Sequence, residues 1–310
     1  IVLSAAGTGT LTGTYTANTV INIVSVASSG TPSCINPQTS NVTLTVLPLP
    51  TASVSITPTT LCSGDSATFT FTGTPNATVT YNINGGANQT VTLNAGGTAT
   101  ITGTYTANTT INIVSVASSG TPSCVNPQTS SITLTVLPLP TASVAVSPAT
   151  ICVNDSATFT FTGTPNATVT YNINGGSNQT VVLDAAGTAT LTGTYLANTT
   201  VNIVSVASAG TPSCVNPQPS SITLTVLPLP TASVSITPTT VCSGDSATFT
   251  FTGTPNATVT YNINGGANQT IVLSGAGTAT LTGTYTTNTT VNIVSVASSG
   301  TPSCVNPQAS

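Results

Sequence analysis

The chain has 310 residues, contains no Lys, Arg, His or Glu, and has a formal net charge of −4 that comes from four Asp. Without cationic side chains it lacks the groups that neutralise nucleic-acid phosphates, which excludes nucleic acid as a partner, and the same lack argues against binding to anionic membrane surfaces. No run of about 18 apolar residues occurs, so we expect no direct membrane insertion in this segment.

The chain consists of one unit repeated with a period of 90 residues. The phrase LPLPTAS starts at residues 47, 137 and 227, and residues 51–130 match residues 231–310 at 70 of 80 positions. Such identity at a fixed period is typical of a tandem array. The predicted parts are the C-terminal part of a truncated repeat (1–49), two complete repeats (50–139 and 140–229) and a repeat without its last strand (230–310). Because residue 1 already matches the middle of a repeat, we expect the natural termini outside this sequence.

Seven short segments of the first complete repeat alternate apolar residues with Thr, Ser or Asn. In chain order they cover residues 51–57, 66–73, 78–84, 89–94, 97–105, 110–116 and 131–138. Alternation with a period of two predicts strands with one buried and one solvated face, and no segment shows helical periodicity. Seven strands with short turns in about 90 residues favour an all-β fold of tandem seven-stranded immunoglobulin-like β-sandwiches.

The segment LPLP joins the last strand of one repeat to the first strand of the next. Two prolines at alternate positions restrict φ, so we expect a short, stiff linker. A seven-residue strand spans roughly 23 Å, and with loops and linker each repeat should advance the chain by about 35 to 45 Å. The predicted architecture is therefore a head-to-tail rod of sandwiches.

Seven cysteines occupy two positions of the repeat, one before the second strand and one between the sixth and seventh strands. They are Cys34, Cys62, Cys124, Cys152, Cys214, Cys242 and Cys304. Two cysteines in a small all-β repeat that lacks His are typical of disulfides in an oxidising, extracellular setting. All seven are therefore disulfide candidates.

Two pairing schemes are compatible with the spacing. Pairing within a repeat gives Cys62–Cys124, Cys152–Cys214 and Cys242–Cys304. Pairing between neighbouring repeats gives Cys62–Cys214 and Cys152–Cys304. Bridged cysteines need Cα atoms within about 7 Å, yet strand directions place the two cysteine-bearing loops at opposite ends of one sandwich. The first scheme therefore requires the long loop before the last strand to fold back along the domain.

We expect no catalytic residue, no metal site and no cofactor. Nucleophilic and general acid–base catalysis use His, Lys or paired carboxylates, and only Asp155 and Asp184 share a repeat, with nothing to place them together. Calcium requires six to eight oxygen ligands that include several carboxylates, and one Asp per repeat falls far short of that. The sequence therefore predicts a protein that is not an enzyme.

Several segments recur in fixed order in each repeat. They include ITPTTLCSGDSATFTFTG, TYNINGG, GTYTANTTINIVSVASSGTPSC and SITLTVLPLP. This layout resembles the immunoglobulin-like repeats of large Bacteroidota surface proteins, including gliding-motility adhesins, which show Cys-x-Gly-Asp-Ser before the second strand and a Cys before the last. Tyr81, Tyr171 and Tyr261 stand where such repeats often carry Trp. The resemblance implies an extracellular, cell-surface location.

The resemblance also implies a covalent modification. In that group an Asp followed by Ser or Thr and a small or apolar residue resembles an O-glycosylation sequon, and Asp-Ser-Ala at residues 65–67, 155–157 and 245–247 matches it. The candidate sites are Ser66, Ser156 and Ser246. The same three Asp residues also suit a turn that starts the second strand, which requires no glycan.

Together these features predict a non-enzymatic stalk or filament segment of a long extracellular adhesin on a bacterial surface. Its partners would be the neighbouring repeats of the same chain and covalent O-glycans. Because the surface has little charge repulsion, an alternative is that identical chains assemble into a multi-chain fibre or sheath. Another alternative is a glycan-binding module that uses Thr, Asn and Tyr as hydrogen-bonding groups.

Overall fold

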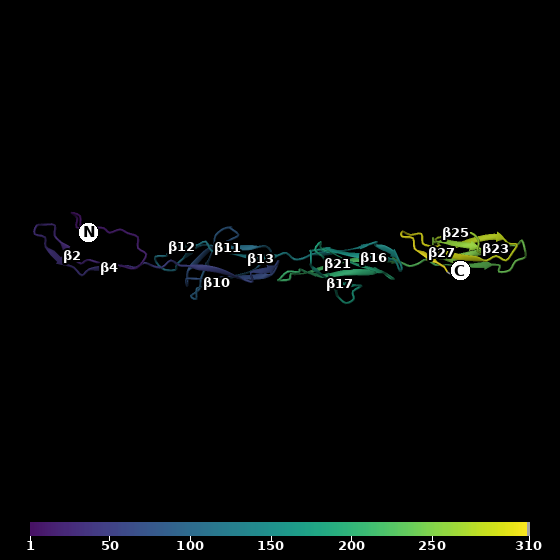
Figure 1. The fold of residues 1–310 in the computed structure, drawn as a ribbon, viewed down its shortest axis with the longest axis horizontal. Coiled ribbons are helices and arrows are strands. Elements are labelled where there is room, and N and C mark those ends of the chain that lie inside the picture. Colours follow the sequence, from purple (N-terminus) through teal and green to yellow (C-terminus); the bar gives the residue numbers. More distant parts are fainter. Residues whose placement is uncertain (309–310) are drawn as a thin grey trace. The chain divides into compact units, whose positions relative to one another are not determined.

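A computed structural model describes residues 1–308 of the chain, and these residues form strands and loops without any helix (Figure 1). No helix that could cross a membrane is therefore present in that range. The structure divides into two compact units, Ile1–Leu137 and Pro138–Ser310. Residues 309 and 310, the end of the predicted last repeat, lie outside the described residues. The predicted all-β fold is confirmed.

The strands of the first unit are β1 (Thr19–Asn22), β2 (Ser25–Ala27), β3 (Ile35–Pro37), β4 (Asn41–Leu44), β5 (Ala52–Thr57), β6 (Thr60–Cys62), β7 (Ser66–Gly73), β8 (Thr78–Ile83), β9 (Gln89–Thr92), β10 (Thr98–Thr104), β11 (Thr109–Ala117), β12 (Val125–Pro127) and β13 (Ser131–Leu137). The strands of the second unit are β14 (Ala142–Ser147), β15 (Thr150–Cys152), β16 (Ser156–Gly163), β17 (Thr168–Ile173), β18 (Gln179–Val182), β19 (Thr188–Thr194), β20 (Thr199–Ala207), β21 (Val215–Leu227), β22 (Ala232–Thr237), β23 (Ser246–Gly253), β24 (Thr258–Ile263), β25 (Gln269–Val272), β26 (Thr278–Thr284), β27 (Val291–Ala297) and β28 (Val305–Pro307).

Residues 52–137 form a β-sandwich. One sheet has the order β10–β7–β5, and the other has the order β6–β13–β11–β8–β9, with β12 also paired to β11. The pairing of β6 with β13 is parallel, and the other pairs are antiparallel. The inner faces enclose a core around Phe69 and Phe71, whose side chains have no exposed surface. Two such sheets packed face to face make an immunoglobulin-like sandwich.

The period-two pattern places alternate side chains in this core. In β7, Ala67, Phe69 and Phe71 are buried, whereas the Thr residues between them are only partly covered. In β8, Val79 and Tyr81 are buried in the same way. Burying such side chains contributes about 1.5 to 3 kcal/mol each, so the alternation determines which face of each strand turns inward.

A β-bulge changes the phase of the alternation in β11. Ile111 and Ile113 are buried, but the next fully buried residue of this strand is Val116. The register with β8 shifts between Ile113 and Ser115. One extra residue reverses which face the following side chains take. The bulge therefore keeps apolar side chains in the core at both ends of the strand.

The structure contains all seven predicted strands of this repeat and adds two short ones. Pro58 cannot donate to a sheet ladder, and β5 ends just before it at Thr57. The chain then changes sheets, so that β6 pairs in parallel with β13. The second addition, β12, pairs with the end of β11. Strands of three residues are too short for a period of two to reveal.

Residues 1–49 form no core of their own. Their strands pair as two separate ribbons, β1 with β4 and β2 with β3. None of these 49 residues is buried, and apolar side chains such as Val42 and Leu44 are largely exposed. A single ribbon has no second sheet against which to bury its apolar face.

The second unit contains two sandwiches. Residues 142–227 repeat the arrangement with the sheets β14–β16–β19 and β15–β21–β20–β17–β18. Residues 232–307 have the sheets β22–β23–β26 and β25–β24–β27–β28. Among the described residues, this third sandwich has no counterpart of β6 and β13. The residues that would correspond to β13 are not part of the sequence.

Candidate functional site

The aspartate of the recurring Cys-x-x-Asp phrase lies in a tight turn. The backbone N–H of Asp65 donates to the carbonyl oxygen of Cys62 at 3.0 Å, and Gly64 has a φ of 96°. A positive φ at the third position suits Gly or Asn. In the next repeat Asn154 takes this place with a φ of 72°. The turn thus explains why Gly in one repeat and Asn in the next occupy equivalent positions.

This turn connects the end of β6 to the start of β7 and is tied to β10. The N–H of Gly64 donates to the carbonyl oxygen of Tyr105 at 2.8 Å, and the N–H of Tyr105 donates to that of Asp65 at 3.0 Å. The Asp side chain points to solvent and is exposed in all three repeats. The side chain of Asp155 accepts a hydrogen bond from the N–H of Cys152 at 3.3 Å.

The three predicted O-glycosylation candidates follow this turn directly. Ser66, Ser156 and Ser246 are the first residues of β7, β16 and β23, and all three are exposed. Their hydroxyl groups are therefore open to solvent at a sheet end, where a bulky substituent would not displace core residues. The prediction of O-glycans stays a prediction.

A disulfide joins the two sandwiches of the second unit. The sulfur atoms of Cys152 and Cys304 are 2.05 Å apart, and their Cα atoms are 5.5 Å apart. Cys152 ends β15, and Cys304 precedes β28 in a loop closed by Ser298, whose hydroxyl accepts from the N–H of Cys304 at 2.8 Å. Both cysteines are buried. Of the two pairing schemes, this bond belongs to the one that joins neighbouring repeats.

The remaining cysteines fall into two groups. Cys62 and Cys214 are also disulfide-bonded. Cys34, Cys124 and Cys242 are free thiols, of which Cys34 and Cys242 are exposed. The within-repeat pairs Cys152–Cys214 and Cys242–Cys304 do not form, because Cys304 is bonded to Cys152. As disulfide candidates, the three free thiols find no partner among the described residues.

The linker between the two sandwiches is anchored at both ends. The N–H of Val153 donates to the carbonyl oxygen of Leu227 at 2.9 Å. The side-chain amide of Asn306 donates to the carbonyl oxygen of Pro230 at 2.9 Å, and Pro230 is buried. Only two residues, Pro228 and Leu229, lie between these anchors. The short, stiff linker predicted from LPLP is therefore also fastened to the sandwich on each side.

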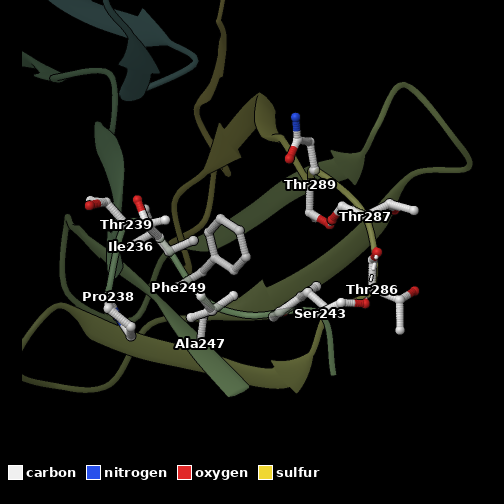
Figure 2. Close-up of a pocket in the computed structure, with 13 residues that line it drawn as sticks. Ile236, Pro238, Thr239, Ser243, Ala247, Phe249, Thr286, Thr287 and Thr289 are labelled. Carbon is white, nitrogen blue, oxygen red and sulfur yellow. Dashed lines mark hydrogen bonds between the residues drawn. The ribbon is translucent and has the colours of Figure 1, made fainter. Parts of the chain in front are cut away.

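A groove of about 470 Å³ lies in the third sandwich, at the place that the last strand fills in the two complete sandwiches (Figure 2). Phe249 is directed into it, with Ile236 on one side and Thr287 and Thr289 on the other (Figure 2). The floor is apolar and the rim carries hydroxyl groups. The sequence indicated this feature only indirectly, because residues 230–310 lack the phrase SITLTVL.

The ionisable groups of the described residues do not form a reactive cluster. No group of three or more His, Cys, Asp or Glu side chains gathers in residues 1–308. The pKa of the Asp184 carboxyl lies below its ordinary value because the N–H and hydroxyl of Thr188 donate to it. Burial raises the pKa of the Tyr81 and Tyr105 phenols. These shifts follow from turn and core structure.

No protein-family model and no curated protein matches the chain. Among solved structures, the chain is similar to a structure of a 1.5-MDa bacterial ice-binding adhesin that was described for host cell surface retention. The two share 18% sequence identity, the match covers 84% of this chain and 95% of that chain, and the TM-score is 0.39. It is also similar to a titin I-band fragment, with 16% identity, 84% and 98% coverage and a TM-score of 0.44. These similarities are too distant to assign a function.

Proposed function

We propose that the chain is a structural stalk segment of a long extracellular adhesin on a bacterial surface, related to those of Bacteroidota gliding motility, and that it has no enzymatic activity. The sequence layout motivates the family, and the tandem sandwiches motivate the structural role. The uncharged Thr-, Ser- and Asn-rich exterior and the disulfide suit an extracellular setting.

The observation that carries the proposal is the double connection between consecutive sandwiches in the second unit. The main chain crosses through the two residues between Leu227 and Pro230, and the disulfide Cys152–Cys304 adds a separate link. Two bodies joined at a single point can rotate about it, whereas a second covalent link at another point removes that freedom. A joint of this kind suits a stalk that must hold a distant tip away from the cell.

Electron microscopy of the oxidised chain tests the proposal. We expect straight particles with sandwiches spaced at about 40 Å. A variant with both Cys152→Ala and Cys304→Ala should show a wider spread of angles between the last two sandwiches, and Cys242→Ala, which alters a free thiol, is the matched control. Compact or freely jointed particles from the oxidised chain would contradict the stalk.

We propose the same neighbour pairing for the other bonded cysteines, since the 90-residue period maps Cys152 and Cys304 onto Cys62 and Cys214. Digestion with a protease that cuts before Asp yields fragments 1–64, 65–154, 155–183, 184–244 and 245–310. Without reduction, fragment 1–64 should remain linked to 184–244. Linkage of 1–64 to 65–154 would instead indicate the within-repeat pair.

We also propose that Ser66, Ser156 and Ser246 carry O-glycans. The sequon-like Asp-Ser-Ala phrase and the exposed position of each hydroxyl support this. The same digest places each serine second in its fragment, so mass spectrometry of the native protein gives a direct answer. Unmodified masses for all three fragments would leave the turn as the sole role of this phrase.

A second candidate function is that of a subunit in a multi-chain fibre. The observation that favours it is the near-absence of charged side chains, since a surface with little charge repulsion permits identical chains to associate. Concentration-dependent light scattering of the purified chain separates this from a single-chain stalk, because only the fibre would grow with concentration.

A further inference from the structure

β14 and β15 lie along β21 for the whole length of the second sandwich. At one end, the side-chain amide of Asn216 donates to the carbonyl oxygen of Pro140 at 2.9 Å. At the other end, β15 pairs in parallel with the last residues of β21. Two stretches of chain therefore cross the sandwich side by side in the same direction. We call residues 140–152 the first stretch and residues 214–227 the second stretch.

Both stretches are almost fully extended. β21 is a single strand of 13 residues, which spans about 43 Å at 3.3 Å per residue. A chain reaches at most about 3.6 Å per residue, so pulling could lengthen this strand by only about a tenth. Between the same two ends, the first stretch uses 12 peptide units (residues 140 to 152) and β21 uses 11 (residues 216 to 227). The first stretch is therefore almost as extended as the second.

Each stretch is covalently joined to the third sandwich. The first stretch ends at Cys152, which bonds Cys304. The second stretch ends at Leu227, from which the main chain reaches Pro230 and then β22. A pull from the third sandwich can therefore enter either stretch without passing through another part of the second sandwich.

Each stretch also has a covalent link at its opposite end. The main chain enters the first stretch at Pro140, and the second stretch starts at Cys214, which is disulfide-bonded. In the neighbour pairing proposed above, the partner of Cys214 is Cys62. Each stretch would then be fastened at both ends, by the main chain at one end and by a disulfide at the other.

The rest of the second sandwich lies outside these two stretches. Residues 153–213 run from one bonded cysteine to the other and supply β16 to β20. They include Phe159 and Phe161, whose side chains have no exposed surface. Because the extended stretches fix the distance between the two ends of the sandwich, tension along them does not pull these core residues apart.

We propose that the disulfide-bonded chain carries tension along two continuous covalent tethers and therefore resists pulling without unfolding. The first tether runs through the first stretch and crosses to the third sandwich at Cys304. The second tether arrives through Cys62, runs through the second stretch and continues along the main chain. This proposal deepens the proposed stalk function by giving it a mechanical role, and the second tether rests on the bond proposed between Cys62 and Cys214.

The disulfides change how far a pull can lengthen the second sandwich. Without them, tension follows the main chain, so that the whole repeat of 90 residues lies in its path. Unfolding would lengthen that path from about 40 Å to about 320 Å. With the bond between Cys152 and Cys304, the path through the sandwich holds 12 peptide units, which can lengthen by only about 4 Å. The tether is therefore taut before the core can separate.

Single-molecule pulling on the full chain tests the first tether. One handle is attached to the free thiol of Cys124 in a chain with Cys34→Ser and Cys242→Ser, and the other handle is attached to the C-terminus. The covalent path runs from residue 124 to 152 and from 304 to 310, and it reaches at most about 120 Å. We expect stretching and relaxation to retrace each other, because this path has little slack.

Cys152→Ala together with Cys304→Ala opens this path. We expect the path to reach about 670 Å, with unfolding steps of more than about 200 Å. The matched control is Cys62→Ala together with Cys214→Ala, which removes the disulfide of the other tether and should leave the path at about 120 Å. Hysteresis in the disulfide-bonded chain, at forces below those that unfold the Cys152→Ala, Cys304→Ala variant, would overturn the first tether. It would show that the first stretch leaves the sandwich before the tether becomes taut.

The second tether is tested with handles on the exposed thiols of Cys34 and Cys242 in a Cys124→Ser chain. Its path runs from residue 34 to 62 and from 214 to 242, and it should reach at most about 200 Å. Here Cys62→Ala with Cys214→Ala should lengthen the path to more than about 600 Å, and the other double variant should leave it unchanged. A long path in the chain with all its disulfides would overturn the second tether together with the proposed Cys62 pairing, whereas failure of the stalk function itself would show as compact particles in electron microscopy.

Discussion

Removal of the disulfide between the last two sandwiches should destabilise the third sandwich more than any other single change to a covalent bond in this chain. The variant is Cys152→Ala together with Cys304→Ala, since both side chains are buried and Ala adds no polar group there. The third sandwich is the sensitive partner because its core is the smallest of the three among the described residues.

The magnitude follows from the loop that the bond closes. The cysteines are 152 residues apart, and the chain-entropy model gives about 5 kcal/mol for closing a loop of that length. If the second sandwich stays folded while the third unfolds, only the roughly 75 residues after Pro230 are released, and the same model gives about 4.5 kcal/mol. A small domain is typically stable by about 5 to 15 kcal/mol, so this is a large share of the total.

Hydrogen exchange followed by mass spectrometry measures the effect for each sandwich separately. Amides of β23 should exchange about a thousandfold faster in the double variant, while those of the equivalent strand β7 in the first unit should be unchanged. Cys242→Ala controls for the loss of a thiol that forms no bond. Exchange in β23 that changes less than about tenfold would refute the loop-closure reasoning.

Three further predictions concern the buried core and two side chains whose pKa is shifted. Leu224→Ala removes a side chain without exposed surface and should lower the unfolding free energy by about 2 to 5 kcal/mol, whereas Leu196→Ala, at a position 72% exposed, should lower it by less than about 0.5 kcal/mol. Denaturant titrations measure both losses, and similar values for the two variants would contradict the burial of Leu224. Hydrogen bonds from Thr188 lower the pKa of the Asp184 carboxyl, so its contribution to stability is present above the unfolded-state pKa and is lost as the pH falls through the folded-state pKa. An NMR titration of the folded protein should give a pKa of Asp184 below 3.8, and a value at or above 3.8 would contradict these hydrogen bonds. Burial raises the pKa of the Tyr105 phenol, so its contribution to stability is present below the unfolded-state pKa and is lost as the pH rises through the folded-state pKa. Ultraviolet titration should show that Tyr105 ionises with a pKa above 10, and a pKa of 10 or lower would contradict its burial.

Much of the fold is predictable because the repeat carries a strong period-two signal. Phe69 and Phe71, separated by a Thr, mark the inner face of β7 without reference to any other strand, and the structure buries both. The first complete repeat shows each of the seven predicted strands. The positions of the cysteines, of the Asp turn and of the exposed serines likewise follow from the period of 90.

The site was predictable only in part. The sequence left two disulfide schemes open, because it shows which cysteines recur but not which pairs approach within bonding distance. The short strands β6 and β12 were missed, since three residues carry too little alternation to detect. The hydrogen bond from Asn306 to Pro230 could not be predicted, because the sequence shows only that VNPQ recurs in each repeat.

The sequence by itself determined that the chain is all-β, that its unit is 90 residues long and which side chains alternate into the core, because each of these depends on residues close together in the chain. Only the tertiary structure decided that β6 joins β13 across the sandwich and that Cys152 meets Cys304. These features join residues up to 152 positions apart, and which distant segments meet depends on how the sheets pack and not on local alternation.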